Sequence, residues 1–293
     1  FPSGVETTKR GGYAYVVAIL RGSPAALAGV QVGDYIRSIN GESTREMSVF
    51  QVRRALTGRP GTMLKLNLFG DGEGRVVEMT LTSFQPSPLT LSGRQGGVFL
   101  IKVHYLGPDT LQALERALSA PPKGTRQVLL DLRNTVGGGR QEGIALADLF
   151  LSEGTIVKVD ERGQEEVIVE ATPAESWDGP LAVLANGLSA GSVEIAIAAL
   201  KENERGRILG ERTFGDASMQ KMIRLPDSSA VILSVGRYLS PGGESWSGSG
   251  VEPDVEIASR DSESQAEEDR EDGQLRRALE YLVKDASALK PAA

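Results

Sequence analysis

The chain has 293 residues, of which 40% are hydrophobic and 24% charged, and these values predict a soluble globular protein of about two domains. The formal net charge of −7 argues against a nucleic-acid or anionic-membrane partner, because no basic cluster along the sequence offsets it. The absence of cysteine excludes disulfides, thiol catalysis and thiolate metal sites. No apolar run approaches the roughly 18–20 residues that span a bilayer. The chain starts at Phe1 rather than Met, which indicates a processed or trimmed product.

Residues 1–83 are predicted to form a small, mostly β unit. Apolar residues alternate or cluster as in strands at 15–20, 64–69 and 76–81, and a short helix is expected between Gly22 and Gly29. Residues 32–41 are predicted to form a turn, an alternating strand and an Asn-Gly hairpin turn. Ser48 is the expected cap of a second helix that continues to about Leu56.

This unit resembles a bacterial PDZ domain through its motifs GSPA at 22–25, AGV at 28–30, GD at 33–34 and ING at 39–41. In such domains a peptide's C-terminal carboxylate binds backbone N–H groups of a loop, and the peptide adds to a strand edge. The resemblance implies peptide-binding residues in the first loop and on the second helix: Phe1, Pro2, Ser3, Gly4, Val5, Val49, Val52 and Arg53. The alternative is a unit that binds no free peptide and only packs on its neighbour.

The rest of the chain has a different pattern. Residues 84–96 contain two prolines and two glycines, which is typical of a linker. In residues 97–258 predicted strands alternate with predicted helices, which indicates a mixed, largely parallel sheet covered by helices. The strands are expected at 97–103, 128–133 and 181–185, and the helices from Asp109, at 142–151 and in the stretch that ends near Leu200. Residues 259–273 form an expected acidic linker, and residues 274–293 an expected amphipathic helix and tail.

Several segments of this α/β part resemble the carboxy-terminal processing peptidases, which are serine peptidases with a Ser-Lys dyad. The segment NGLSAGSVEI at 186–195 resembles N-x-x-S-A-S-A-S-E-I, and TFGDASMQ at 213–220 resembles T-F-G-K-G-S-V-Q. DLRNTVGG at 131–138 resembles D-L-R-x-N-P-G-G, although Thr135 and Val136 replace Asn-Pro. ADLFL at 147–151, GERTFG at 210–215 and GSGVEPDV at 248–255 also fit. The resemblance covers about residues 1–257 and implies a PDZ domain joined to a ClpP/crotonase-like peptidase core.

The resemblance places Gly191 at the nucleophile and Asp216 at the lysine base. It places the lysine-orienting glutamine at Gln220, and the oxyanion-hole N–H groups at Gly137, Gly138 and Ser192. Glycine has no nucleophilic side chain, and a carboxylate with an ordinary pKa near roughly 4 is a poor base for a serine hydroxyl. The expectation is therefore a catalytically dead peptidase homologue.

Three further interpretations concern residues near Gly191 and Asp216 and the single histidine. Ser189 or Ser192 with Lys221 could form a rearranged dyad, which would leave an active endopeptidase that cuts near protein C-termini. The single histidine, His104, is interpreted as a strand residue, and no acidic or His cluster has metal-ligand spacing, so no metal and no cofactor are expected. The Asp216 carboxylate could accept the N–H groups of residues 191–193 at the start of a helix.

The predicted function is binding rather than cleavage. The expected partners are protein or peptide C-termini held by the PDZ-like unit, and either an active peptidase relative or a second copy of the chain. The resemblance implies a periplasmic, envelope or other extracytoplasmic location.

Overall fold

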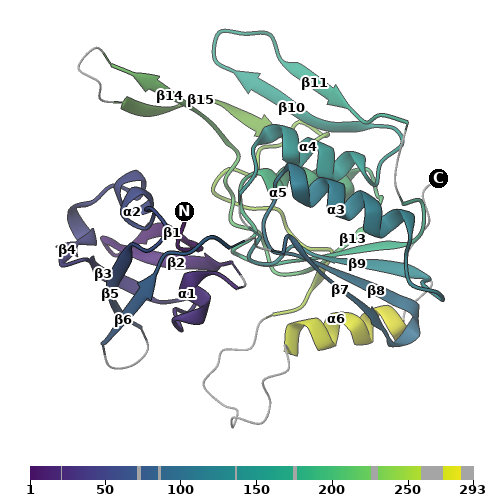
Figure 1. Cartoon of the computed structure of the whole chain (residues 1–293). Helices are drawn as coiled ribbons and strands as arrows, with labels where there is room; N and C mark the ends of the chain where they lie inside the picture. The colour runs from purple at the N-terminus through teal and green to yellow at the C-terminus, as the bar shows by residue number, and fades with distance from the viewer. Residues whose placement is uncertain are drawn as a thin grey trace. The chain divides into compact units, whose positions relative to one another are not determined.

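The structure is a computed structural model that describes residues 1–20, 22–70, 74–84, 87–135, 137–173, 177–225, 230–258 and 273–284. The chain forms two compact units, Phe1–Ser87 and Pro88–Ala293 (Figure 1). Within the ranges given above, no helix is long and apolar enough to cross a membrane. The acidic segment 259–272 and the tail 285–293 lie outside the described residues.

The first unit is a six-stranded sheet with two short α-helices. Its strands are β1 (Val5–Arg10), β2 (Tyr13–Ile19), β3 (Tyr35–Ile39), β4 (Glu42–Ser43), β5 (Met63–Phe69) and β6 (Arg75–Thr80). Their order is β1-β2-β3-β5-β6, with β4 paired to β3. The α-helices are α1 (Pro24–Leu27) and α2 (Val49–Ala55), and a 3-10 helix, η1 (Thr44–Glu46), precedes α2.

The predicted start of α2 is confirmed. The Ser48 hydroxyl accepts the Gln51 N–H at 3.2 Å, and the Gln51 side chain accepts the Ser48 N–H at 2.7 Å. This reciprocal pair satisfies two N–H groups that have no partner inside the helix. Val52 and Leu56, one turn apart, then reach the core beside Val16 and Ile36.

The second unit is built on a six-stranded sheet in the order β16-β13-β12-β9-β8-β7. The strands are β7 (Leu89–Arg94), β8 (Val98–Val103), β9 (Gln127–Asp131), β12 (Leu181–Ala185), β13 (Arg207–Gly210) and β16 (Val255–Glu256). All neighbours are parallel except the antiparallel pair β7 and β8. The expected largely parallel sheet is therefore present.

Helices cover both faces of this sheet, as Figure 1 shows. On one face are α3 (Pro108–Ser119), α4 (Arg140–Asp148) and α5 (Ser192–Glu202), and on the other is α6 (Gly273–Lys284). The strands are consequently buried on both sides, and β9 and β12 have no exposed residue. Both buried strands end at turns, 132–139 and 186–191, that lead into α4 and α5.

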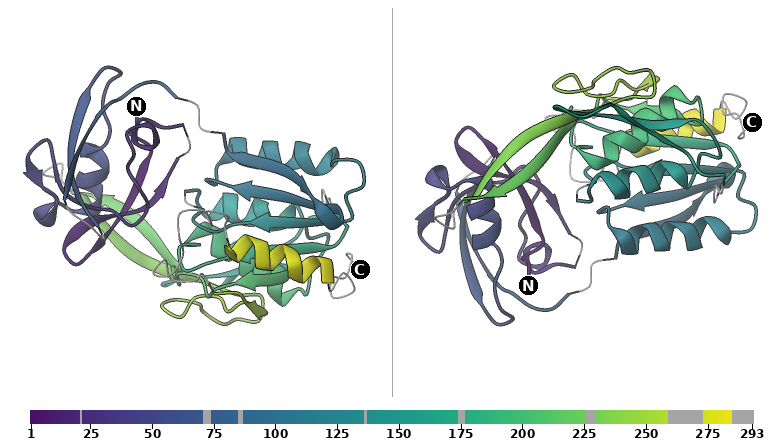
Figure 2. Two further views of the ribbon diagram at one scale, coloured as in Figure 1. Left: turned by 90° about the horizontal axis from the view of Figure 1, so that it is seen from below. Right: turned by 90° about the horizontal axis from the view of Figure 1, so that it is seen from above.

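A second sheet in this unit was not predicted from the sequence. It is antiparallel, in the order β11-β10-β15-β14. Its strands are β10 (Thr155–Glu161), β11 (Val167–Glu170), β14 (Ser218–Arg224) and β15 (Ala230–Leu239). The β14–β15 hairpin projects from the remainder of the unit (Figure 2).

Two expectations about element boundaries are wrong. Residues 89–94, inside the expected linker 84–96, form β7, because Leu89 and Leu91 alternate with polar residues and pair in register with β8. The short helix η2 (Gln95–Gly97) follows it. Asp109 does not cap α3, since Gly107 is the N-cap and Pro108 the first helical residue.

Candidate functional site

The turn between β12 and α5 ends at Gly191. This residue is the N-cap of α5 and has φ 71° and ψ −122°, a conformation that residues with a Cβ rarely adopt. A Cβ built at Gly191 would have no heavy atom within 4 Å. The backbone therefore presents an open position at the start of a helix, and no side chain occupies it.

The Glu194 carboxylate connects this turn to the segment 213–216. One oxygen accepts the N–H groups of Gly191 and Asp216 at 2.9 and 2.8 Å. The other accepts the Gly215 N–H at 2.7 Å and the Thr213 hydroxyl at 2.5 Å. Glu194 is fully buried. Burial raises the pKa of Glu194, and its four hydrogen bonds oppose that rise.

The Asp216 side chain turns toward Ser218. Its Oδ1 accepts the Ser218 hydroxyl at 2.6 Å and the Ser218 N–H at 3.2 Å. The Gln220 amide in turn donates to the Ser218 hydroxyl at 3.4 Å. Asp216, Ser218 and Gln220 therefore form one short chain of hydrogen bonds at the start of β14.

The hypothesis that Asp216 accepts the first N–H groups of α5 is corrected by these contacts. The Gly191 N–H donates to Glu194 instead. Glu194 lies three residues after the N-cap, so its side chain folds back on the helix start as in a capping box. The Asp216 backbone reaches the same carboxylate, but its side chain does not take this role.

The glycine loop lies directly against the start of α5. The Ser192 hydroxyl donates to the Gly137 carbonyl at 2.8 Å. Gly137 and Gly138 have φ values of 83° and 73°, and a Cβ at Gly138 would lie 3.0 Å from the Ser192 Oγ. The structure thus brings together the three expected oxyanion-hole positions. Val136 of the same loop lies outside the described residues.

Polar contacts that the sequence did not suggest join the two turns and hold the first of them on the sheet. Asn134 and Asn186 exchange hydrogen bonds, at 2.8 Å between their side chains and 3.2 Å from the Asn134 N–H. The buried Asp131 carboxylate accepts from Arg133 at 2.7 and 2.9 Å and from Lys102 at 3.1 Å. Burying a carboxylate is costly unless it is paired and hydrogen-bonded in this way. Charged residues at the end of an apolar strand were the available sequence signal.

The two serines that flank Gly191 are engaged in structural hydrogen bonds. Ser189 is fully buried, donates to the Leu132 carbonyl at 2.9 Å and accepts the Asn186 N–H at 3.1 Å. Ser192 directs its proton to the Gly137 carbonyl. Lys221 is exposed on β14, and among the described residues no hydrogen bond joins it to either hydroxyl.

Charges of both signs border this site. Burial raises the pKa of Tyr238, with the Asp216 carboxylate contributing in the same direction and Arg140 opposing it. Arg140 is the first residue of α4, directly after the glycine loop. His104, interpreted from the sequence as a strand residue, instead lies directly after β8, and its ring contacts the Thr90 hydroxyl of β7 at 2.8 Å. Among the residues that the structure describes, no group of three or more His, Cys, Asp or Glu side chains could hold a metal ion.

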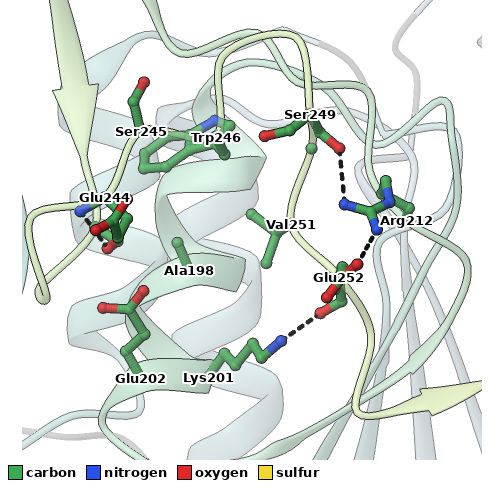
Figure 3. A pocket seen from close by; sticks show the side chains of 12 residues that line it. Ala198, Lys201, Glu202, Arg212, Glu244, Ser245, Trp246, Ser249, Val251 and Glu252 are labelled. Carbon is green, nitrogen blue, oxygen red and sulfur yellow. Dashed lines mark hydrogen bonds and ion pairs between the residues drawn. The ribbon is translucent and has the colours of Figure 1, made fainter.

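A separate pocket of about 240 Å³ lies beside the second half of α5 and under the segment 244–252 (Figure 3). Its cations contact neighbouring groups of the same chain: Lys201 donates to the Glu252 carbonyl at 2.7 Å, and Arg212 pairs with the Glu252 carboxylate. Gly191 and Asp216 are not among its lining residues. The pocket is therefore distinct from the site at the start of α5.

The expected peptide groove of the first unit lies between β1 and α2. β1 is an edge strand, and α2 lies against it. An ion pair of 3.4 Å between Glu6 of β1 and Arg53 of α2 spans the two elements. Burial raises the pKa of Glu6, and the Arg53 charge partly offsets this.

The other residues expected to bind the peptide differ in where they lie and in how exposed they are. Residues 1–3 run beside the segment after α2, through hydrogen bonds of Ser3 with Leu56 and of Gly58 with Phe1, both at 3.0 Å, and through a bridge of Pro2 to Thr57. The remaining expected residues range from buried to half-buried: Gly4, Val5 and Val52 are buried, and Val49 is half-buried.

These features define a serine-peptidase scaffold that carries a PDZ domain. The PDZ domain model matches residues 15–67. The chain belongs to peptidase family S41, whose model matches residues 81–257. The resemblance inferred from the sequence motifs is thereby confirmed.

Individual relatives support the same assignment. A "Probable CtpA-like serine protease" of Staphylococcus aureus is 29% identical over 258 residues, 87% of this chain and 52% of that protein. The "Carboxy-terminal processing protease CtpA" of Bacillus subtilis is 28% identical over 255 residues, 86% of this chain and 55% of that protein. The chain thus spans about half the length of these curated relatives. The solved structure of a photosystem II D1 C-terminal processing protease has a TM-score of 0.74 and 27% identity, covering 88% of this chain and 72% of that one.

Proposed function

We propose that this chain is a catalytically inactive member of the S41 family that acts by binding protein C-termini through its PDZ domain. The observation that carries the proposal is Gly191. The position that the family's motif assigns to the nucleophile has the backbone conformation of a sharp strand-to-helix turn and open space around it, but no hydroxyl. Loss of a comparable serine in a well-studied protease lowers turnover about a million-fold.

The surroundings of Gly191 support the loss of the chemical step with the rest of the site retained. Glu194 still ties the turn to the segment that bears Asp216, and the glycine loop still lies against the start of α5. Ser189 and Ser192 donate their protons to backbone carbonyls, so neither hydroxyl is directed toward a base. A peptide could still occupy such a frame without being cut.

The PDZ domain supports the binding role. An edge strand beside a helix is the arrangement in which a peptide adds as a further strand, with its carboxylate held by backbone N–H groups. An active peptidase of the same family and a second copy of the chain are the proposed macromolecular partners. An extracytoplasmic compartment is the proposed location.

Binding and cleavage are tested together with the purified chain. A labelled peptide that ends in an apolar residue with a free carboxylate is compared with the same peptide as a C-terminal amide. Charge-assisted hydrogen bonds to the carboxylate should make the free acid bind at least about tenfold more tightly. An unfolded protein in the same buffer should remain uncut. Equal affinity for acid and amide would reject C-terminus recognition, and cleavage that Ser192→Ala or Lys221→Ala abolishes would support an active endopeptidase with a rearranged dyad instead.

A further inference from the structure

The outer face of the sheet in the first unit carries a continuous row of aromatic rings. Tyr13 contacts Phe69 edge-on at 5.3 Å between ring centroids, and Phe69 stacks on Tyr35 at 5.0 Å. Tyr35 contacts Tyr15 at 4.9 Å. The residues between them in sequence are buried, so the rings lie on the face of the sheet opposite the core and α2. This aromatic row, formed by Tyr13, Phe69, Tyr35 and Tyr15, is separate from the groove at the β1 edge.

Three arginines cover rings of the aromatic row. The guanidinium carbon lies 5.6 Å from the Tyr13 centroid for Arg45, 5.3 Å from that of Phe69 for Arg37, and 5.1 Å from that of Tyr15 for Arg10. All three side chains are exposed. In the part of the chain that the structure describes, no carboxylate lies within ion-pair distance of any of them.

A guanidinium held over a ring is ordered in advance, and its N–H donors point outward from the edges of its plane. Those donors match the two oxygens of a carboxylate, which they can bind as a pair of parallel hydrogen bonds. Because the ring restricts the arginine before a ligand arrives, less side-chain entropy is lost on binding. The three arginines therefore form ordered and unneutralised carboxylate receptors along the aromatic row.

The net charge of the whole chain does not reveal that the first unit is basic. The net charge is −7, yet the first 87 residues contain ten Lys and Arg against seven Asp and Glu. Arg10 ends β1, Arg37 lies on β3 and Arg45 lies in η1. They are far apart in the sequence and meet the same row of rings because β1, β2 and β3 are neighbours in the sheet and η1 packs against β2 and β3. The sequence-based expectation that no basic cluster exists is corrected for this face.

We infer that the aromatic row and its three arginines bind an extended acidic segment of a partner protein. In an extended chain, side chains on the same face are roughly 7 Å apart. This spacing lies between one and two of the distances between neighbouring ring centroids, which are 4.9 to 5.3 Å. The rings are half-buried, and Tyr13, Tyr15 and Phe69 are already covered by arginines, which disfavours stacking of nucleic-acid bases and insertion into a lipid interface. Carboxylates require no free ring face, so they suit this surface best.

The test uses the full chain and a fluorescent peptide of twelve residues with Glu at alternate positions and Ser between them. The C-terminus is an amide, so that the peptide groove is not probed. Fluorescence anisotropy should detect binding that weakens with added salt, and the peptide with Gln in place of Glu should not bind. Replacing Arg10, Arg37 and Arg45 together by Ala should weaken binding about tenfold or more.

The matched control replaces three exposed arginines elsewhere, Arg54, Arg59 and Arg116, by Ala, with the same change in net charge and unchanged affinity expected. Replacement of Arg10, Arg37 and Arg45 by Lys should also weaken binding, because Lys lacks the planar donor pair. Equal affinity of that variant and the wild type would show diffuse attraction only, and overturn the proposal.

Two further measurements distinguish an acidic partner segment from two other ligands of this face, an anionic membrane and the chain's own acidic segment. Binding of vesicles with anionic lipid, but not of the Glu peptide, would assign the face to a membrane surface and overturn the proposal. Peptide binding that appears only after the acidic residues of 261–272 are replaced by Gln and Asn would assign it to the chain's own segment, with the same consequence. Thermal unfolding of each variant near the wild-type temperature confirms that a loss of binding is not a loss of fold.

Discussion

Replacing Gly191 with serine returns a hydroxyl to the turn before α5 at a calculable conformational cost. The residue has φ 71° and ψ −122°, a region that side chains with a Cβ populate rarely. No heavy atom lies within 4 Å of the added Cβ, so collision contributes nothing and the cost comes from backbone strain. Gly191→Ser should therefore lower the free energy of unfolding by about 1–3 kcal/mol.

Urea unfolding followed by circular dichroism measures this difference. Gly93→Ser is the matched control, since Gly93 also has open space around its Cβ and has no positive φ. That change should be neutral or slightly stabilising, by less than about 1 kcal/mol, because it only restricts the unfolded chain. If Gly191→Ser proved as neutral as the control, the turn would not hold the strained conformation. A loss well above about 3 kcal/mol would indicate a collision and would equally refute the reasoning.

Three further predictions concern the frame and the groove. Gly191→Ser combined with Asp216→Lys should cleave an unfolded protein at least about a hundredfold faster than the wild type in a gel assay, because the positioning groups remain. Glu194→Gln should lower stability by about 1–3 kcal/mol at acid pH, since an amide nitrogen cannot accept the N–H that a carboxyl oxygen accepts. Burial raises the folded-state pKa of Glu194 above its usual 4.5. The contribution of Glu194 to the free energy of unfolding is therefore fully present below pH 4.5 and is lost as the pH rises through the folded-state pKa. The gap between wild type and Glu194→Gln in urea titrations should accordingly narrow with rising pH, and a widening gap would contradict this. Arg53→Ala should weaken binding of the free-carboxylate peptide about two- to fivefold in anisotropy, yet change stability by less than about 1 kcal/mol, because the Arg53 side chain is exposed and its 3.4 Å pair with the half-buried Glu6 is screened by solvent on the arginine side.

The fold was largely predictable because its signals are local. Ser48 with Gln51 defines the start of α2, and the uninterrupted apolar run at 181–185 becomes the buried strand β12. The antiparallel sheet with β10 and β15 was missed, since its register depends on pairing between residues such as Lys158 and Leu239 that are far apart in the chain.

The site was only partly predictable. Sequence motifs located Gly191 and Asp216, but they did not reveal that both backbone N–H groups share one oxygen of Glu194. The signal available was an acid three residues after a helix N-cap. The Asp216 side chain was assigned the wrong partner, because its contact with Ser218 depends on the local geometry where β14 begins.

The most direct test of the central claim is a cleavage assay with the wild-type chain and an unfolded protein, run beside the Ser192→Ala and Lys221→Ala variants and followed by mass spectrometry. The expected result is no fragment above the enzyme-free background in any of the three samples, because position 191 has no nucleophile. Fragments produced by the wild type and lost in either variant would contradict the account.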